Sequence, residues 1–284
     1  MKTKQTSTIS AQLLATAVWA CTKGLKRKAI CIFFFIISYG VHAAPAGYPL
    51  SYSPKDMLID LLAGQWDAQY NTVKWKATPG DVHEFNGVLS TQPFLYSVVD
   101  TTFVMGRGDE QRYYVVFSTA PMMADETGEL VNANSCHVCG VNLGFFSYTK
   151  DNDSIYLDKF KRNIATHGSF GSRPYALSLI NLGDGYELLQ VDDPYEGMGT
   201  TSIATRFYSD GELVLSMISA ENNQGNRERN EKGYYEFTTA FTYDPKMHSI
   251  TIRQTGYRIG EQSGKKIVTN KTKKLVLDNN TLQF

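Results

Sequence analysis

The sequence lacks the short motifs that identify common enzyme and cofactor-binding families. It contains no G-x-S-x-G segment, no phosphate-binding loop, no dinucleotide-binding fingerprint and no EF-hand loop. Cysteine is scarce, with four residues in the whole chain and no second C-x-x-C pair to complete a zinc site. Because no motif identifies a function, the indications of function are the expected compartment, the expected fold and the positions of individual residues.

Acidic residues are absent from residues 1–43, which carry six basic side chains. Although the formal net charge of the whole chain is zero, the remaining residues hold 22 basic and 28 acidic side chains, a net charge of −6. A mildly acidic chain does not attract polyanions, which argues against nucleic acid and anionic membrane surfaces as partners.

The N-terminal region is typical of an export signal. Lys26–Lys28 forms a basic segment, and Ala29–Tyr39 is an apolar run too short to span a bilayer comfortably. Val41 and Ala43 put small residues at the −3 and −1 positions of a cleavage site after Ala43. We therefore predict a signal peptide over residues 1–43, with an atypical N-terminal extension, and a periplasmic or secreted protein without a stable membrane span after cleavage.

Three alternatives explain the extension in residues 1–25. The start codon could be wrongly assigned, a first signal could end at Cys21 as a lipid anchor, or the apolar run could be retained as a membrane anchor.

The rest of the chain, residues 44–284, predicts a single mainly β domain with one short helix. Ser53 is a suitable N-cap, Pro54 fits the first helical position, and Gly64 is placed to end the helix. Beyond residue 65, aromatic and β-branched stretches predict strands, including 81–90, 94–105 and 112–119, and residues 120–135 predict a long polar loop. Four later pairs of such stretches flank turn-forming centres at 151–153, 183–185, 209–211 and 244–246.

This pattern predicts an antiparallel hairpin meander, either a two-sheet sandwich or an irregular, propeller-like form. In a meander the tight turns share one end of the sheet and the longer connections share the other. We predict those connections at 166–174, 192–201 and 221–233, and long loops on a rigid scaffold commonly bind partners. The candidate binding residues at that end are His137, His167, Arg173, Asp192, Asp193, Tyr195, Glu196, Asn222 and Asn223.

Cys136 and Cys139 are the cysteines expected to remain after export, and an oxidising compartment favours a disulfide between them. A zinc site would need further ligands such as His83 and His167, and a redox pair usually opens a helix, whereas residues 140–146 predict a strand. We expect a local staple that shapes the loop, with zinc binding and thiol redox chemistry as the alternatives.

Three carboxylates within Asp192–Gly197 could bind calcium or act as a general acid and base, but their spacing matches no specific loop and a solvated turn is the favoured explanation. His167 beside Gly168-Ser169 suggests a nucleophile pair by composition alone. We assign no catalytic residue, no metal ligand and no cofactor, and leave calcium and zinc as alternatives.

The segments SCHVCG, FFSYTKDND, THGSFG, YEGMGT and SAENNQG lie within residues 134–260. In these segments the chain resembles exported bacterial proteins of unknown activity that combine a Cys-His-x-Cys segment with aromatic-rich hairpins. The resemblance implies export and a β-rich fold.

We therefore expect a binding protein more than an enzyme, with a protein or glycan partner in the cell envelope or outside the cell. An inhibitor or immunity protein would be one case. The first alternative is a secreted hydrolase that uses Asp192, Asp193, Glu196 or His167, with or without calcium. The second is a metal-binding or redox module at Cys136, His137 and Cys139.

Overall fold

The computed structural model describes residues 47–84, 93–106, 111–133, 136, 139–169, 171, 173, 176–278 and 281–283. Contacts divide the chain into Met1–His42 and Ala43–Phe284, and every described residue belongs to the second unit. The predicted signal peptide therefore lies outside the described residues, and the single domain over 44–284 stays a prediction.

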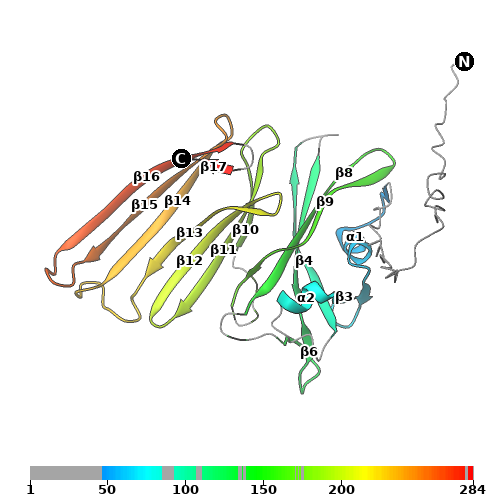
Figure 1. Cartoon of the computed structure of the whole chain (residues 1–284), viewed down its shortest axis with the longest axis horizontal. Helices are drawn as coiled ribbons and strands as arrows, with labels where there is room; N and C mark the ends of the chain where they lie inside the picture. Colours follow the sequence, from blue (N-terminus) through cyan, green and yellow to red (C-terminus); the bar gives the residue numbers. More distant parts are fainter. Residues whose placement is uncertain are drawn as a thin grey trace, which may run out of the picture. The chain divides into compact units, whose positions relative to one another are not determined.

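Two large antiparallel sheets make up most of the described residues, so the prediction of a mainly β meander with a short helix is confirmed (Figure 1). The N-terminal sheet contains, in spatial order, β1 (Tyr48–Pro49), β9 (Ser154–His167), β8 (Val141–Lys150), β5 (Arg112–Ala120), β4 (Phe94–Met105), β3 (Thr72–Lys76) and β2 (Gln65–Asp67). A separate small hairpin, β6 (Met122–Ala124) and β7 (Leu130–Asn132), interrupts the loop expected at 120–135.

The C-terminal sheet follows the order of the sequence without a crossover, because each strand pairs with the next. Its strands are β10 (Ala176–Asn181), β11 (Glu187–Gly197), β12 (Thr200–Ser209), β13 (Glu212–Asn222), β14 (Tyr235–Asp244), β15 (Ser249–Ile259), β16 (Lys266–Asp278) and β17 (Thr281–Gln283). All four expected hairpins form, as β8–β9, β10–β11, β12–β13 and β14–β15.

The connection expected over 192–201 is wrong. Asp192–Gly197 belongs to β11 and Thr200 begins β12, so only Met198 and Gly199 form the turn between them. Both have positive φ, 51° and 73°, as a two-residue hairpin turn of this twist requires. Methionine is unusual at such a position, which is why local turn chemistry gave no sign of it.

Helix α1 (Pro54–Leu61) begins as predicted and ends one residue earlier than predicted. Ser53 and Asp56 form a capping box, in which each side chain bonds the backbone of the other. The left-handed residue after the C-cap is Ala63, with φ 48°, and Gly64 follows it. Gly64 donates its N–H to the Ile59 carbonyl at 2.8 Å, and a Cβ on Gly64 would lie 2.7 Å from Val73 Cγ1. The glycine is needed for close approach to β3.

A second helix, α2 (Pro79–Glu84), occupies part of the stretch expected as a strand over 81–90. Thr78 N–H and the Thr78 hydroxyl both donate to Asp81 Oδ2 at 2.6 Å, with Pro79 at the first helical position. This Thr-x-x-Asp arrangement is a helix-start signal, and it overrides the β-prone residues that follow.

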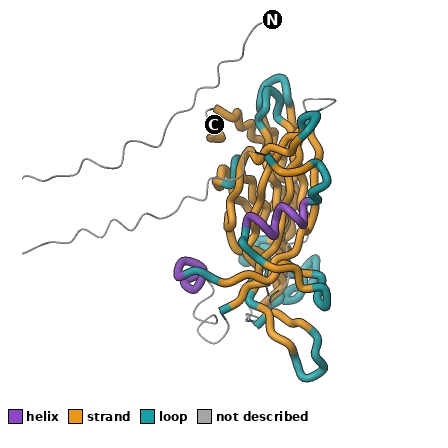
Figure 2. Tube along the Cα trace, turned by 90° about the vertical axis from the view of Figure 1, so that its right-hand side faces the viewer, coloured by secondary structure: helices purple, strands orange, loops and turns teal. Residues whose placement is uncertain are grey.

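Hydrophobic packing joins these elements in three clusters. Met57 and Leu58 of α1 cover one face of the N-terminal sheet, against Val73, Phe117 and Phe146. The other face packs on the C-terminal sheet, where Leu143 and Val116 share a cluster with Leu189, Val191 and Tyr208. The two described helices are short beside the strands (Figure 2), and neither has the length and apolar character to cross a membrane.

The C-terminal sheet curls on itself, which gives it an inner face. Strands that are not neighbours in its order share the third cluster, as Phe207 of β12, Phe241 of β14 and Leu275 of β16 do. Tyr243 of β14 also donates its hydroxyl to Gln190 Oε1 of β11 at 2.6 Å. We call the face that carries these side chains the inner face of the C-terminal sheet.

Candidate functional site

The inner face continues beyond the apolar cluster towards the end where the longer connections lie. Side chains alternate between the two faces of a strand, so Tyr235 and Phe237 share the inner face with Phe241 and Tyr243. The strand register places Tyr235 opposite Arg258 and Phe237 opposite Gly256. In turn Arg258 lies opposite Ile267 and Gly256 opposite Thr269.

A cavity of about 1310 Å³, which we call the C-terminal groove, is lined by Tyr235, Phe237, Arg258, Ile267 and Thr269. Its floor is built from β13–β16, and its rim from residues 223–233 and 260–263. The groove combines aromatic rings, carboxylates, guanidinium groups and amides; among its lining residues are Glu221, Asn223, Tyr235, Phe237, Arg258 and Thr269. Such a mixture can hold a polar ligand that also has an apolar surface.

Side-chain to backbone hydrogen bonds hold the loop over 223–234 in place. Asn223 donates its amide to the Gly233 carbonyl at 2.9 Å and accepts the Tyr235 N–H at 2.9 Å. Gly233 donates its N–H to the Ile259 carbonyl at 3.0 Å, and Asn226 donates to the Met198 carbonyl of the neighbouring turn. The loop is thus tied to both neighbouring hairpins, so the rim is preformed.

Two tyrosine–glutamate pairs set the electrostatics of the groove. Tyr235 donates its hydroxyl to Glu221 Oε1 at 2.8 Å, and Tyr234 donates to Glu236 Oε2 at 2.6 Å. Burial, followed by the neighbouring glutamate, raises the pKa of both tyrosines. Both phenols therefore stay neutral donors at pH 7, and Arg229 lies 3.5 Å from the Glu236 carboxylate.

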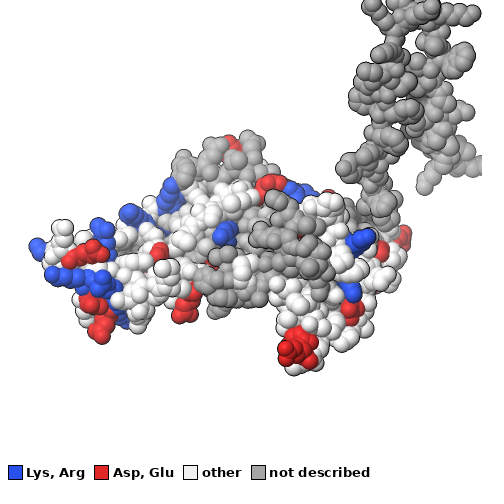
Figure 3. All heavy atoms as spheres, turned by 60° about the horizontal axis from the view of Figure 1, so that its bottom comes forward, with Lys and Arg blue, Asp and Glu red and all other residues white. Residues whose placement is uncertain are grey.

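Charges of both signs gather around this end of the C-terminal sheet. In the space-filling view, blue and red atoms lie side by side at the left, where Figure 1 places the ends of β14–β16 (Figure 3). The groove itself is lined by Glu221, Glu236 and Glu261 and by Arg227 and Arg258. A ligand would therefore meet acceptors and donors close together, with no single dominant sign.

A second polar cluster lies between the two sheets and holds His167 and Asp193 together. His167 Nε2 lies 2.9 Å from the Tyr208 hydroxyl, and its Nδ1 lies 3.1 Å from an Arg206 nitrogen. Arg206 contacts Asp193 Oδ2 at 3.0 Å, and the Gly168 N–H donates to Asp193 Oδ1 at 2.9 Å. The His167 side chain is 0% exposed, so the cluster joins the sheets and presents no ring to solvent.

Burial and hydrogen bonding act in opposite directions on Asp193. Burial raises the pKa of its carboxyl, but the contacts with His167 and Arg206 outweigh that effect and leave the pKa below its usual value. Burial also raises the pKa of Tyr208 to about 12. At neutral pH the cluster thus contains a carboxylate paired with a guanidinium and a neutral phenol.

The three carboxylates of Asp192–Gly197, considered as a calcium or acid–base site, do not share one face of β11. Asp192 accepts from the Thr205 hydroxyl at 2.6 Å on the inner face, whereas Asp193 joins the cluster on the opposite face. Glu196 is exposed near the Met198–Gly199 turn. In the described part of the chain, no three histidine, cysteine, aspartate or glutamate side chains gather as they would around a metal ion.

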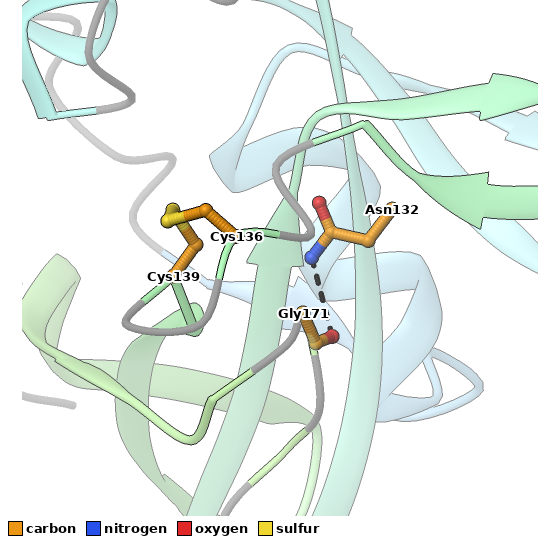
Figure 4. Close-up of a disulfide and its surroundings, with 4 residues drawn as sticks. All are labelled: Asn132, Cys136, Cys139 and Gly171. Atoms are coloured by element: carbon orange, nitrogen blue, oxygen red, sulfur yellow. Dashed lines mark hydrogen bonds between the residues drawn. A yellow bond between two sulfur atoms is a disulfide. The ribbon is translucent and has the colours of Figure 1, made fainter.

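Cys136 and Cys139 lie at disulfide-bonding distance, with 2.03 Å between the sulfur atoms (Figure 4). The segment after the bridge packs tightly against the end of β9, because a Cβ on Gly140 would lie 1.9 Å from the His167 carbonyl oxygen. Gly171 donates its N–H to the Cys139 carbonyl at 2.7 Å, and Asn132 donates its amide to the Gly171 carbonyl at 3.2 Å. The bridge therefore sits beside a tightly packed connection, and its role as a local staple stays a prediction. His137 lies outside the described residues.

Arg173 pairs with a buried carboxylate on the N-terminal sheet. Its guanidinium lies 3.0 Å from Asp100 Oδ1, and Ser118 donates its hydroxyl to the other oxygen of Asp100. The register of β4 slips between Val99 and Thr101, so Asp100 is the extra residue of a β-bulge. Burial raises the pKa of the Asp100 carboxyl, and the contacts with Ser118 and Arg173 offset this only in part.

Eight of the nine candidate binding residues are described, and they do not form one cluster. His167 and Asp193 meet in the buried cluster, Asn223 lines the groove with Asn222 next to it in sequence, and Arg173 pairs with Asp100. Sequence reasoning missed Glu221, Tyr235, Phe237 and Arg258 of the groove. A signal existed, because Tyr235, Phe237, Phe241 and Tyr243 occupy one face of a single strand.

Comparison of the chain with protein-family models, with curated proteins and with solved structures finds no match.

Proposed function

We propose that this chain is an exported, periplasmic or secreted binding protein that holds an extended partner in the C-terminal groove. The observation that carries the proposal is the groove itself, a cavity of about 1310 Å³ lined by β13–β16 and the loops at their ends. Its rim is tied down by the Asn223 and Asn226 side chains, so little ordering of the loop would oppose binding.

The dimensions of the floor favour an extended ligand. Neighbouring strands lie about 4.8 Å apart, so the four strands β13–β16 span roughly 14 Å. Phe237 and Tyr235 supply apolar surface, while Glu221 and Arg258 supply hydrogen-bonding groups beside them. Polypeptides and glycans both have apolar and polar surfaces side by side, which could match these groups.

No observation in the described residues favours the hydrolase alternative. Its candidates His167 and Asp193 are held in hydrogen bonds between the sheets, and Asp192 is engaged by Thr205. For the metal alternative, a cysteine pair in a disulfide offers no thiolate, which is the form that binds zinc.

Affinity capture from envelope and culture-medium fractions tests the proposal. Four immobilised proteins would be compared: the original chain, Arg258→Glu and Phe237→Ala in the groove, and Met123→Ala on the exposed hairpin β6–β7 as a matched surface control. Far-ultraviolet circular dichroism would establish that all four are folded.

We expect at least one protein or glycan to bind the original chain and Met123→Ala, and to be lost or at least tenfold weaker with the groove variants. An identical set of bound molecules for all four proteins would contradict the proposal, as would binding to none.

A further inference from the structure

One wall of the C-terminal groove is also an open edge of the sheet. In β16 the residues Lys266–Leu275 pair with β15 on one side. On the other side, β17 covers only Val276–Asp278. Within the described part of the chain, ten residues of β16 therefore have no strand along their outer edge.

The hydrogen bonding of β16 to β15 shows which backbone groups of β16 point outward. Leu277 donates its N–H to the His248 carbonyl at 2.8 Å, so Leu277 points towards β15. Successive residues of a strand direct their N–H and C=O to opposite sides, and the register with β15 runs without a bulge. The outward backbone groups thus belong to Lys266, Val268, Asn270, Thr272 and Lys274.

The same edge is strongly basic. Lys265, Lys266, Lys271, Lys273 and Lys274 lie along it, and residues 262–277 contain no acidic side chain. Strand alternation puts Lys266 and Lys274 on one face and Lys271 and Lys273 on the other. Both faces of the open edge therefore have positive charge.

Apolar side chains are exposed on the same strand. Val268 is 70% exposed, and Ile267, on the inner face at the groove, is 42% exposed. Lysines on an edge strand ordinarily protect it from pairing with copies of itself, and that reasoning applies here. A second copy of β16 would bring lysine against lysine. The protective role of the lysines does not explain why Ile267 and Val268 are exposed. Lysines also do not prevent pairing with a strand of opposite charge.

We propose that the outer edge of β16 docks an acidic, extended polypeptide segment, which adds to the C-terminal sheet as a further strand. This inference rests on the proposed binding function and names the class of its partner. The partner backbone bonds the outward groups of Val268, Asn270 and Thr272, its acidic side chains face the lysines, and its apolar side chains cover Ile267 and Val268. Its residues on the inner side extend the wall of the groove beside Thr269.

The probe is a synthetic ten-residue peptide with two valines at one end and alternating threonine and glutamate over the rest, labelled for fluorescence anisotropy. We expect saturable binding that weakens as salt is raised, because exposed charge pairs are screened. Two control peptides would be measured beside it, one with lysine in place of glutamate and one with the same charge but a central proline. Both should bind at least tenfold more weakly.

Variants of the protein locate the contact. Val268→Pro removes an outward N–H and leaves the bonds to β15 in place, whereas Val268→Thr keeps the N–H and is the matched control. We expect Val268→Pro and the double variant Lys271→Glu/Lys274→Glu to lose about tenfold in affinity. Val268→Thr, which keeps the N–H and loses only part of the apolar contact, should lose much less than Val268→Pro. Amide exchange by nuclear magnetic resonance should show new protection at Val268, Asn270 and Thr272 on adding the peptide.

Equal binding of the acidic and lysine peptides, or of the proline peptide and the probe, would overturn the inference. So would binding that dextran sulfate reproduces without amide protection on β16, which would indicate simple polyanion attraction. These outcomes are separable from the groove proposal. A captured partner that needs Arg258 and Phe237 but tolerates Val268→Pro and Lys271→Glu/Lys274→Glu would support binding in the C-terminal groove. It would contradict docking at the outer edge of β16.

Discussion

His167 Nε2 of β9 lies 2.9 Å from the hydroxyl oxygen of Tyr208 on β12, and this contact joins the N-terminal sheet to the C-terminal sheet. The two rings meet edge to face, with 5.7 Å between centroids. Tyr208 is 2% exposed, so water cannot replace either partner.

Tyr208→Phe should lower the free energy of unfolding by about 1–3 kcal/mol, because a buried imidazole nitrogen loses its partner. Chemical denaturation at pH 7 measures the change. Tyr70→Phe is the matched control, since the Tyr70 hydroxyl bonds the Gly128 carbonyl at the surface and its loss should cost no more than about 0.5 kcal/mol. Equal effects of the two substitutions would show that His167 gains nothing from Tyr208.

The carboxyl of Asp193 should make stability depend on acid. Its pKa is lower in the folded chain than the ordinary value of 3.8, so the folded state favours the ionised form. This contribution is complete above about pH 4 and is lost as pH falls through the folded pKa. Asp193→Asn should cost on the order of 2 kcal/mol at pH 7, with the cost shrinking below pH 4. A constant cost from pH 7 to pH 2.5 in denaturation curves would refute this assignment.

Asp100 should behave in the opposite sense. Burial raises its pKa in the folded chain, so ionisation is harder there than in the unfolded chain. That group stabilises the fold below the unfolded pKa, and the contribution falls as pH rises through the folded pKa. Asp100→Asn should therefore match the original chain near pH 3 and gain relative to it as pH approaches 7. Thermal unfolding at several pH values measures this, and a variant that loses stability at pH 7 would show that the pair with Arg173 outweighs burial.

Local chemistry explains how much of the fold was predictable. The Asp- and Gly-rich centres at 151–153 and 209–211 specify tight turns by their own conformational preferences, and α1 has its cap in the sequence. Met198 is the exception, because its positive φ is imposed by the pairing of β11 with β12. The residue types in a turn indicate only local conformational preferences, and they do not reveal a conformation that strand pairing imposes.

The candidate site was less predictable because contacts between residues far apart in the sequence create it. Glu221 and Tyr235 meet through pairing of β13 with β14, and Arg258 joins them from β15. His167 and Arg206 come from different sheets, 39 residues apart. No local pattern encodes such contacts, although the aromatic alternation on β14 indicates which face would be covered.

Cys136 and Cys139 should resist alkylation without reductant and take two alkyl groups after reduction, as intact mass would show. Because the bridge spans a sequence separation of three residues, the chain-entropy model gives it only about 2 kcal/mol. Reduction should therefore lower the melting temperature modestly and leave the C-terminal sheet folded. Two reactive thiols in the unreduced protein would contradict the predicted disulfide between Cys136 and Cys139.

Gly140 is the residue after the staple, and its replacement should be more damaging than loss of the bridge itself. A Cβ at this position would lie 1.9 Å from the His167 carbonyl oxygen and 2.9 Å from that of Gly168, both of them backbone atoms that cannot rotate away. Gly140→Ala should thus destabilise the chain by about 3 kcal/mol, at the upper end of overpacking effects. Gly80→Ala is the control, because its nearest contact would be the Thr78 hydroxyl at 3.9 Å and alanine favours the helix α2. Denaturation of both variants at pH 7 decides the matter: a Gly140→Ala protein as stable as Gly80→Ala would mean that the end of β9 can move, and the Cys136–Cys139 segment would then not brace it.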